Sequence, residues 1–342
     1  MKRRVPSLLI GGIGVVLILM TFIANLFWAG PAFERVTDAF RPEMQATQLS
    51  QLRRDVNGLA AVQSEFTTKA VPQLAAAAGM SPQQFSALLT SQYPAVAAGL
   101  GAVPQVTGQF TGVLNVLDAE ATRFHRADAI PTKSLPATTV PWGLAGAGLL
   151  CIAVAVVLPR RRGAVAAVAL GLILVVAPLA MMLPRKADAA DTMNSHLKTV
   201  YTAQLVSGAR QSLTGMQAMG TELQTKLLPG LATMLHQSPA QLNGYLAANF
   251  PAVATNLASM PAALDRFDRL VNAFDRELAD YNTAKKTSLV PLVWILMAGG
   301  LLVAGIGGFL LVSGEAEAAA EGRERLSLRE RLAHAPRERL SH

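Results

Sequence analysis

The chain has 342 residues, of which 51% are hydrophobic and 15% are charged, and its mean hydropathy is +0.35. A soluble protein of this length does not carry so much apolar surface, so the composition indicates an integral membrane protein. The formal net charge is +8, but six positive charges lie in two short clusters beside apolar stretches. This placement is typical of charges that orient a membrane protein, and it excludes a nucleic-acid-binding surface.

Four stretches without a charged side chain are each about 20 residues long, the length that a helix needs to cross a bilayer core. Lys and Arg cluster before the first stretch and between the second and third, and such clusters stay on the cytoplasmic side. Abundant Ala and more Arg than Lys favour a bacterial source, so we expect a multi-pass plasma-membrane protein with both termini in the cytoplasm. The predicted segments are 1–6 (cytoplasmic), 7–30 (span), 31–140 (outer), 141–158 (span), 159–162 (cytoplasmic turn), 163–183 (span), 184–288 (outer), 289–312 (span) and 313–342 (cytoplasmic tail).

The first outer segment contains sequences that recur in the second. Residues 81–85, SPQQF, recur as 238–242, SPAQL, and residues 93–97, YPAVA, recur as 250–254, FPAVA. Both pairs are separated by 157 positions, which predicts a tandem internal repeat. Because each copy holds an even number of spans, the copies are expected to be parallel and related by a pseudo-two-fold axis along the membrane normal.

Each outer segment is predicted to form a long helical hairpin. Ser, then Pro, then Gln two residues later is a capping box with proline at the first helical position, so short helices are expected over residues 82–92 and 239–249. After each of them, apolar residues alternate spacings of four and three, as in a coiled coil or helical bundle. No pattern predicts a strand, so the fold class is all-α. The spaced positions are Val96, Leu100, Val103, Thr107, Phe110 and Leu114 in the first copy and Val253, Leu257, Met260, Leu264, Phe267 and Val271 in the second.

A second apolar stripe runs beside this seam. Val113 adjoins Leu114, and Leu270 adjoins Val271. A lone two-helix hairpin cannot cover both stripes, so we expect the two hairpins to pack together within one chain, with Phe110 and Phe267 buried.

Small residues at four-residue spacing occur in the second and fourth predicted spans. Such residues allow close helix approach. Two interpretations remain open, packing among the four spans and contact with another protein. The candidate residues are Gly143, Ala147, Gly300, Ala304 and Gly308.

Acidic residues flank the seam at equivalent positions of both copies, namely Asp118 with Glu120 and Asp275 with Glu277. They are interpreted either as a solvated helix flank or as a docking surface for a protein partner. Glu and Lys four residues apart, at residues 65 and 69 and again at 222 and 226, form the pattern of an exposed helix surface.

No catalytic or metal-binding pattern is present in the sequence. The five histidines lack ligand spacing, the spans contain no ionisable side chain, and the single cysteine, Cys151, lies within a span. We therefore expect neither an enzyme nor a channel, and no cofactor or metal.

Three functions fit these expectations. The first is a non-enzymatic accessory or scaffold subunit that presents its outer bundle to a partner protein in a bacterial envelope assembly. The second is a carrier that holds a lipid or amphiphile between the hairpins, and the third is a membrane-anchored, sensor-like ligand-binding protein. The expected partners are membrane lipids, envelope proteins and an apolar ligand, and no nucleic acid. Three Arg-Glu-Arg-Leu units, at residues 323–326, 329–332 and 337–340, are interpreted as a docking helix or a mobile tail.

Overall fold

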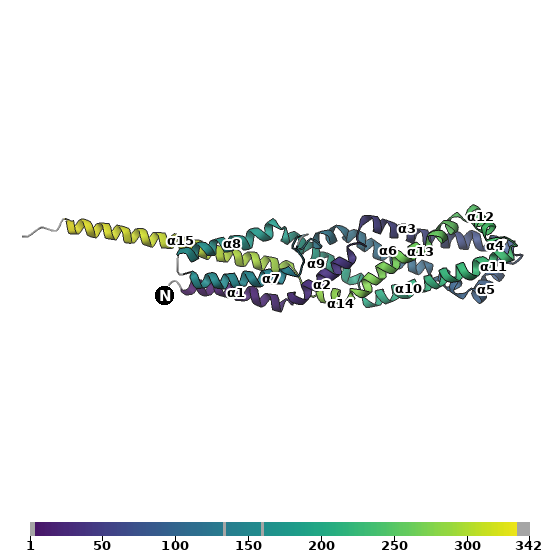
Figure 1. The fold of residues 1–342 in the computed structure, drawn as a ribbon, viewed down its shortest axis with the longest axis horizontal. Helices are drawn as coiled ribbons and strands as arrows, with labels where there is room; N and C mark the ends of the chain where they lie inside the picture. The colour runs from purple at the N-terminus through teal and green to yellow at the C-terminus, as the bar shows by residue number, and fades with distance from the viewer. Residues whose placement is uncertain (1–3, 133–134, 159–160, 334–342) are drawn as a thin grey trace, which may run out of the picture. The chain divides into compact units, whose positions relative to one another are not determined.

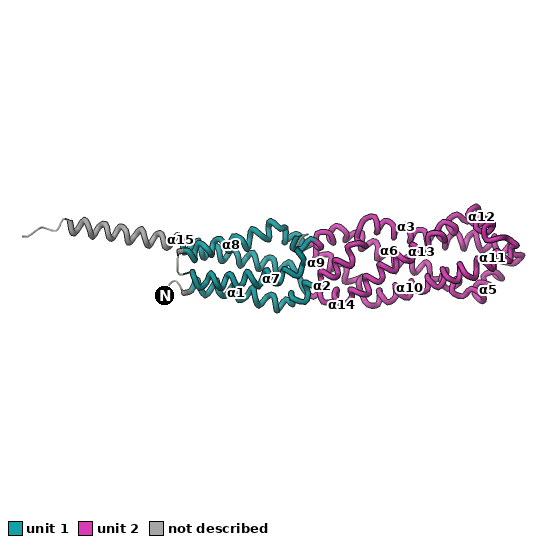
Figure 2. Tube along the Cα trace, viewed as in Figure 1, with its two compact units in different colours: residues 1–31, 129–188, 287–342 teal, residues 32–128, 189–286 magenta. Residues whose placement is uncertain are grey.

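The computed structural model describes residues 4–132, 135–158 and 161–333, with side chains described as far as Ser313. The basic residues Lys2, Arg3 and Arg160 and the side chains of the Arg-Glu-Arg-Leu units lie outside this part. The described residues form helices and no strand, and only an isolated bridge joins Thr132 and Leu135. The predicted all-α fold class is confirmed. Contacts divide the chain into unit 1, residues 1–31, 129–188 and 287–342, and unit 2, residues 32–128 and 189–286 (Figure 2).

Unit 1 contains the four helices that are long and apolar enough to cross a membrane (Figure 1). They form because each sequence is apolar on every face and supplies its own backbone hydrogen bonds. Helix α1 ends at Ile23, before the end of the span predicted over residues 7–30. Asn25 then adopts a positive φ of 54°, which interrupts the helix. The four helices are α1 (Arg4–Ile23), α7 (Thr139–Val157), α8 (Arg161–Ala180) and α15 (Val290–Ala333).

Unit 2 is a bundle of helices from both outer segments. Two further helices, α2 (Leu26–Phe40) and α9 (Leu183–Val200), contain residues of both units. From the first segment come α3 (Ala46–Glu65), the π-helix η1 (Phe66–Ala70), α4 (Val71–Ala77), α5 (Pro82–Gln92) and α6 (Pro94–Ala127). From the second come α10 (Ala203–Glu222), the π-helix η2 (Leu223–Leu227), α11 (Leu228–Met234), α12 (Pro239–Asn249), α13 (Pro251–Arg276) and α14 (Leu278–Ala284).

Local backbone features of unit 2 match at positions 157 residues apart. The predicted capping boxes form at Ser81 and Ser238, and they begin α5 and α12 at the predicted residues. Gly79 and His236 precede them with positive φ angles of 69° and 53°. The same conformation therefore falls on glycine in the first segment and on histidine in the second.

Helices of the two outer segments pack against each other within the chain. Besides the pairs α3 with α6 and α10 with α13, α6 packs against α10 and α3 packs against α13. Phe110 and Phe267 are 5% and 4% exposed, and their ring centroids lie 4.7 Å apart. The predicted burial of both rings is confirmed, and each ring completes the core around the other.

Candidate functional site

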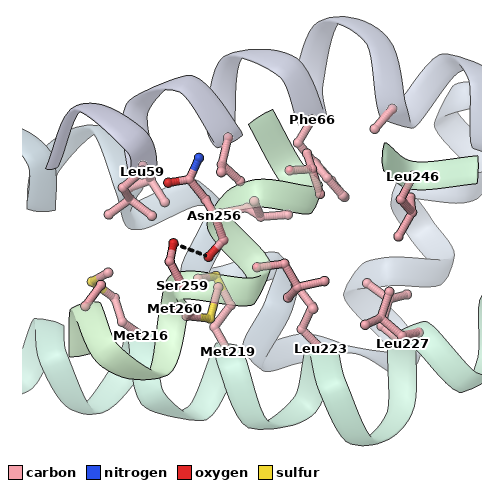
Figure 3. Close-up of a pocket in the computed structure, with 18 of the residues that line it drawn as sticks. Leu59, Phe66, Met216, Met219, Leu223, Leu227, Leu246, Asn256, Ser259 and Met260 are labelled. Atoms are coloured by element: carbon pink, nitrogen blue, oxygen red, sulfur yellow. Dashed lines mark hydrogen bonds between the residues drawn. The ribbon is translucent and has the colours of Figure 1, made fainter. Parts of the chain in front are cut away.

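A mostly apolar cavity of about 90 Å³ lies inside unit 2. In Figure 3, side chains of α3 and η1 and side chains of α10 and η2 point toward each other across it, and Asn256, Ser259 and Met260 of α13 lie between them. A cavity with a mostly apolar lining favours apolar molecules. The side chains that define it include Leu59, Phe66, Met216, Leu223, Leu227 and Met260.

The cavity lies where α13 is less buried than the matching part of α6. Val96, Val103 and Val106 of α6 are 0%, 1% and 3% exposed. Residues 157 positions later on α13, which are Val253, Met260 and Ala263, are only half-buried, and all three line the cavity. Between Pro251 and Arg266, no residue of α13 is fully buried.

One pair of positions 157 residues apart differs between the two helices. Gly99 of α6 has no side chain, so Met219 of α10 lies directly against its backbone, where even a methyl group would overlap the sulfur. The position 157 residues later is Asn256, whose amide instead lies over Gly58 of α3. The two positions therefore contact the facing helix differently, and we expect this difference to contribute to the looser packing of α13, because close packing is sensitive to added volume.

Polar groups line the cavity only at Asp55, Asn256 and Ser259. Asp55 Oδ2 and Oδ1 accept hydrogen bonds from Nε and Nη2 of Arg266, at 2.7 and 2.9 Å. These side chains are only 8% and 15% exposed, so the ion pair ties α13 to α3 from a largely buried position. Asn256 Nδ2 donates to the carbonyl of Ala252 at 2.8 Å.

Two glutamates cap the returning helices of the bundle, and their interpretation as exposed surface residues is wrong. Glu222 Oε2 accepts hydrogen bonds from the backbone N–H groups of Ala95 and Val96, at 2.7 and 3.0 Å. Glu65 Oε2 accepts one from Val253, at 2.9 Å. Each carboxylate therefore caps the first turn of the returning helix from the other segment, where N–H groups lack helical partners.

The electrostatics of the Glu222 cap favour the charged carboxylate. Burial opposes ionisation, but the N–H groups of Val96 and Ala95 and the ammonium of Lys226 outweigh it and hold the pKa of Glu222 below its ordinary value. Glu65 and Glu222 are 9% and 7% exposed. The Glu-to-Lys spacing could not predict these caps, because their partners lie as far as 127 and 188 residues away in sequence.

The four acidic residues that flank the seam do not form one surface. Asp118 and Asp275 are exposed, and each contacts an arginine of the helix beside it, Arg53 at 3.4 Å and Arg210 at 2.6 Å. The pairs are equivalent in the two segments and leave both aspartates accessible to solvent.

Glu120 and Glu277 lie deeper than expected for a solvated flank. Glu120 is 2% exposed, and its Oε1 accepts a hydrogen bond from Arg123 at 2.7 Å and lies 2.7 Å from Nδ1 of His196. Glu277 is half-buried, and burial together with the neighbouring Asp280 raises its pKa. The expectation of a solvated flank is therefore wrong for Glu120.

The small residues in the spans are used unequally within the chain. Gly300 and Ala304 of α15 lie against Gly171 of α8, and Ala147 packs into the core of unit 1. A methyl group added at Gly143 or Gly308 would meet no heavy atom within 4 Å. Close approach of α1 and α7 occurs instead at Gly14 and Gly148, which the four-residue spacing did not identify.

Comparison with known proteins does not indicate a function for this chain. No protein-family model matches this chain, and no curated protein matches it at a significant level. Within the described residues, no group of three or more His, Cys, Asp or Glu side chains is placed to hold a metal ion. The arrangement can hold an apolar molecule with a few polar groups on one side of it.

Proposed function

We propose that this chain is a non-enzymatic, membrane-anchored binding protein whose outer bundle holds the apolar chain of a lipid or amphiphile. The cavity beneath α13 carries this proposal. Its lining is mostly apolar and comes from both segments, so binding a hydrocarbon chain there is favourable, because apolar surface is buried and new packing contacts form. The four apolar helices of unit 1 are the anchor.

The proposed setting is a bacterial plasma membrane, with both termini in the cytoplasm and residues 31–140 and 184–288 outside. Matching features at an interval of 157 residues, from the capping boxes to the glutamate caps, support a tandem, parallel repeat with a pseudo-two-fold relation between its hairpins. Single cysteines at the exposed positions Asn57 and Gln217, in a Cys151→Ala background, should react with a membrane-impermeant maleimide added to intact cells. Labelling only after cell lysis would contradict this topology.

Purification in mild detergent, followed by mass spectrometry of the bound small molecules, tests the binding proposal. The wild-type protein should retain an apolar molecule. The Met260→Trp variant should lose it, because indole fills the cavity that Met260 lines. The matched control is Ala262→Trp, on the exposed face of the same helix. Equal retention by both variants would contradict the proposal.

A scaffold role in an envelope assembly is the second candidate, and the equivalent exposed pairs Arg53 with Asp118 and Arg210 with Asp275 favour it. They present two matching polar surfaces on a bundle whose helices are also tied by Arg35 to Asp280. Cross-linking in intact cells should recover a protein partner, and a double Asp118→Ala, Asp275→Ala variant should release it. Recovery of the same partner by this variant would count against docking at these pairs.

A further inference from the structure

We infer that the cavity takes the single chain of an amphiphile whose head group is a hydrogen-bond donor, an alcohol or an amine, in preference to a carboxylate. This inference rests on the proposed function and adds the chemical class of the ligand. It follows from the cavity volume and from the balance of donors and acceptors on its polar side.

The volume limits the ligand to one chain. An engineered cavity of about 150 Å³ in another protein holds one benzene molecule. The cavity here is about 90 Å³, so it accommodates part of one hydrocarbon chain and no second chain beside it. A two-chain phospholipid could insert one tail only, with the other left outside the bundle.

The polar side of the cavity is rich in acceptors. Asp55 has about four lone-pair sites and uses two of them for Arg266. The Ser259 hydroxyl donates its only hydrogen to the backbone carbonyls of Thr255 and Asn256, at 3.2 Å each, and keeps its lone pairs. These groups can accept hydrogen bonds from a donor on the ligand.

Few donors remain for an anionic head group. One N–H of Asn256 is committed to Ala252, which leaves a single side-chain N–H on the lining. Arg266 commits Nε and Nη2 to Asp55 and does not itself line the cavity. A carboxylate would therefore meet the Asp55 carboxylate and few donors, whereas a hydroxyl or ammonium group could donate hydrogen bonds to Asp55 and Ser259.

The test uses C12 chains that carry a diazirine in the chain and end in an alcohol, an amine or a carboxylate. The full-length protein is reconstituted in nanodiscs at pH 8 and irradiated, and labelling of the peptide over residues 253–267 is measured against probe concentration. Labelling of α15 (Val290–Ala333), which contains a predicted span, normalises for the amount of each probe in the bilayer. The alcohol and the amine should half-saturate the 253–267 peptide at about tenfold lower concentration than the carboxylate, a difference of about 1.4 kcal/mol.

The Asp55→Asn variant provides a second measurement. It removes the negative charge from the cavity lining, so the disadvantage of the carboxylate should disappear and the three probes should label alike. Circular dichroism checks that the variant keeps its helix content. If the variant is unfolded, the head-group preference is judged from the wild-type labelling alone.

Three results would overturn part or all of the inference. Equal or stronger labelling by the carboxylate in the wild type would refute the head-group preference while leaving the proposed binding function in place. An unchanged order in a folded Asp55→Asn variant would refute the role of Asp55. Labelling of residues 253–267 no greater than that of α15 for every probe would refute the binding function as well.

Discussion

The helices α6 and α13 return along the same bundle from equivalent capped tips, yet only α6 has fully buried residues in its first half. Glu222 holds the first turn of α6 with two hydrogen bonds, and Glu65 holds that of α13 with one. Met219 packs against Gly99 on α6, whereas Asn256 occupies the equivalent position on α13. Similar sequences thus give the same helices, but the helices differ in how closely they pack.

The largest expected effect concerns the layer that the two helices share. Replacing Phe110 or Phe267 with Ala should lower the free energy of unfolding by about 3 to 5 kcal/mol, because each ring is buried and its removal leaves a void. Thermal or chemical unfolding followed by circular dichroism measures it. The double variant should lose less than the sum, since each ring is the other's neighbour. A change near zero at either position would place that ring on an open surface.

The next prediction tests whether the residues at positions 99 and 256 determine how closely α6 and α13 pack against the neighbouring helices. Gly99→Asn should lower the free energy of unfolding by about 1 to 3 kcal/mol, because its side chain overlaps Met219. Asn256→Gly should let α13 approach its neighbours and slow hydrogen exchange around Val253 and Met260. Its cost in helix propensity is about 0.3 to 0.5 kcal/mol, because Asn is itself a weak helix former.

These two variants control for each other, since each introduces the residue found 157 positions away in the sequence. If Gly99→Asn left the stability and the exchange of α6 unchanged, the cavity would have another origin.

A smaller effect is expected at the turns before the tip helices. His236 adopts a positive φ of 53°, which costs a residue with a side chain about 1 to 2 kcal/mol, while the first segment has Gly79 at that place. His236→Gly should therefore raise the free energy of unfolding by about 1 kcal/mol, and Gly79→Ala should lower it by a similar amount. Both are measured by chemical unfolding. A loss of stability in His236→Gly would show that the imidazole makes contacts worth more than the strain.

The smallest expected effect is on pH dependence. The pKa of Glu222 is lower in the folded chain than its ordinary value of 4.5, so the stability from this cap is complete above that value and is lost as pH falls through the folded pKa. The melting temperature of Glu222→Gln should lie below that of the wild type at pH 7, and the two should converge in acid. Because the comparison is a difference, the opposite trend of Glu277, whose pKa is raised, cancels. A gap that does not change with pH would contradict the ionised cap.

Local sequence signals predicted the elements of this fold well. A capping box uses residues three positions apart, so Ser81 and Ser238 identified α5 and α12 to the residue. The apolar stretches identified four helices long enough to span a membrane, although Asn25 ends the first one early. The seam spacing placed Phe110 and Phe267 in the core, but it could not show that their rings meet.

The sequence by itself determined an all-helical chain with four apolar helices and two similar segments between them, because hydrophobic period, span length and helix caps depend on neighbours within a few turns. Only the tertiary structure decided that Glu65 and Glu222 are caps rather than surface residues and that Glu120 is buried. It also decided that a cavity lies beneath α13. These features depend on partners far apart in the sequence, such as Glu120 with His196 and Asp55 with Arg266. A local pattern does not indicate which side chain will face a carboxylate, or which of two matching helices will leave a cavity beside it.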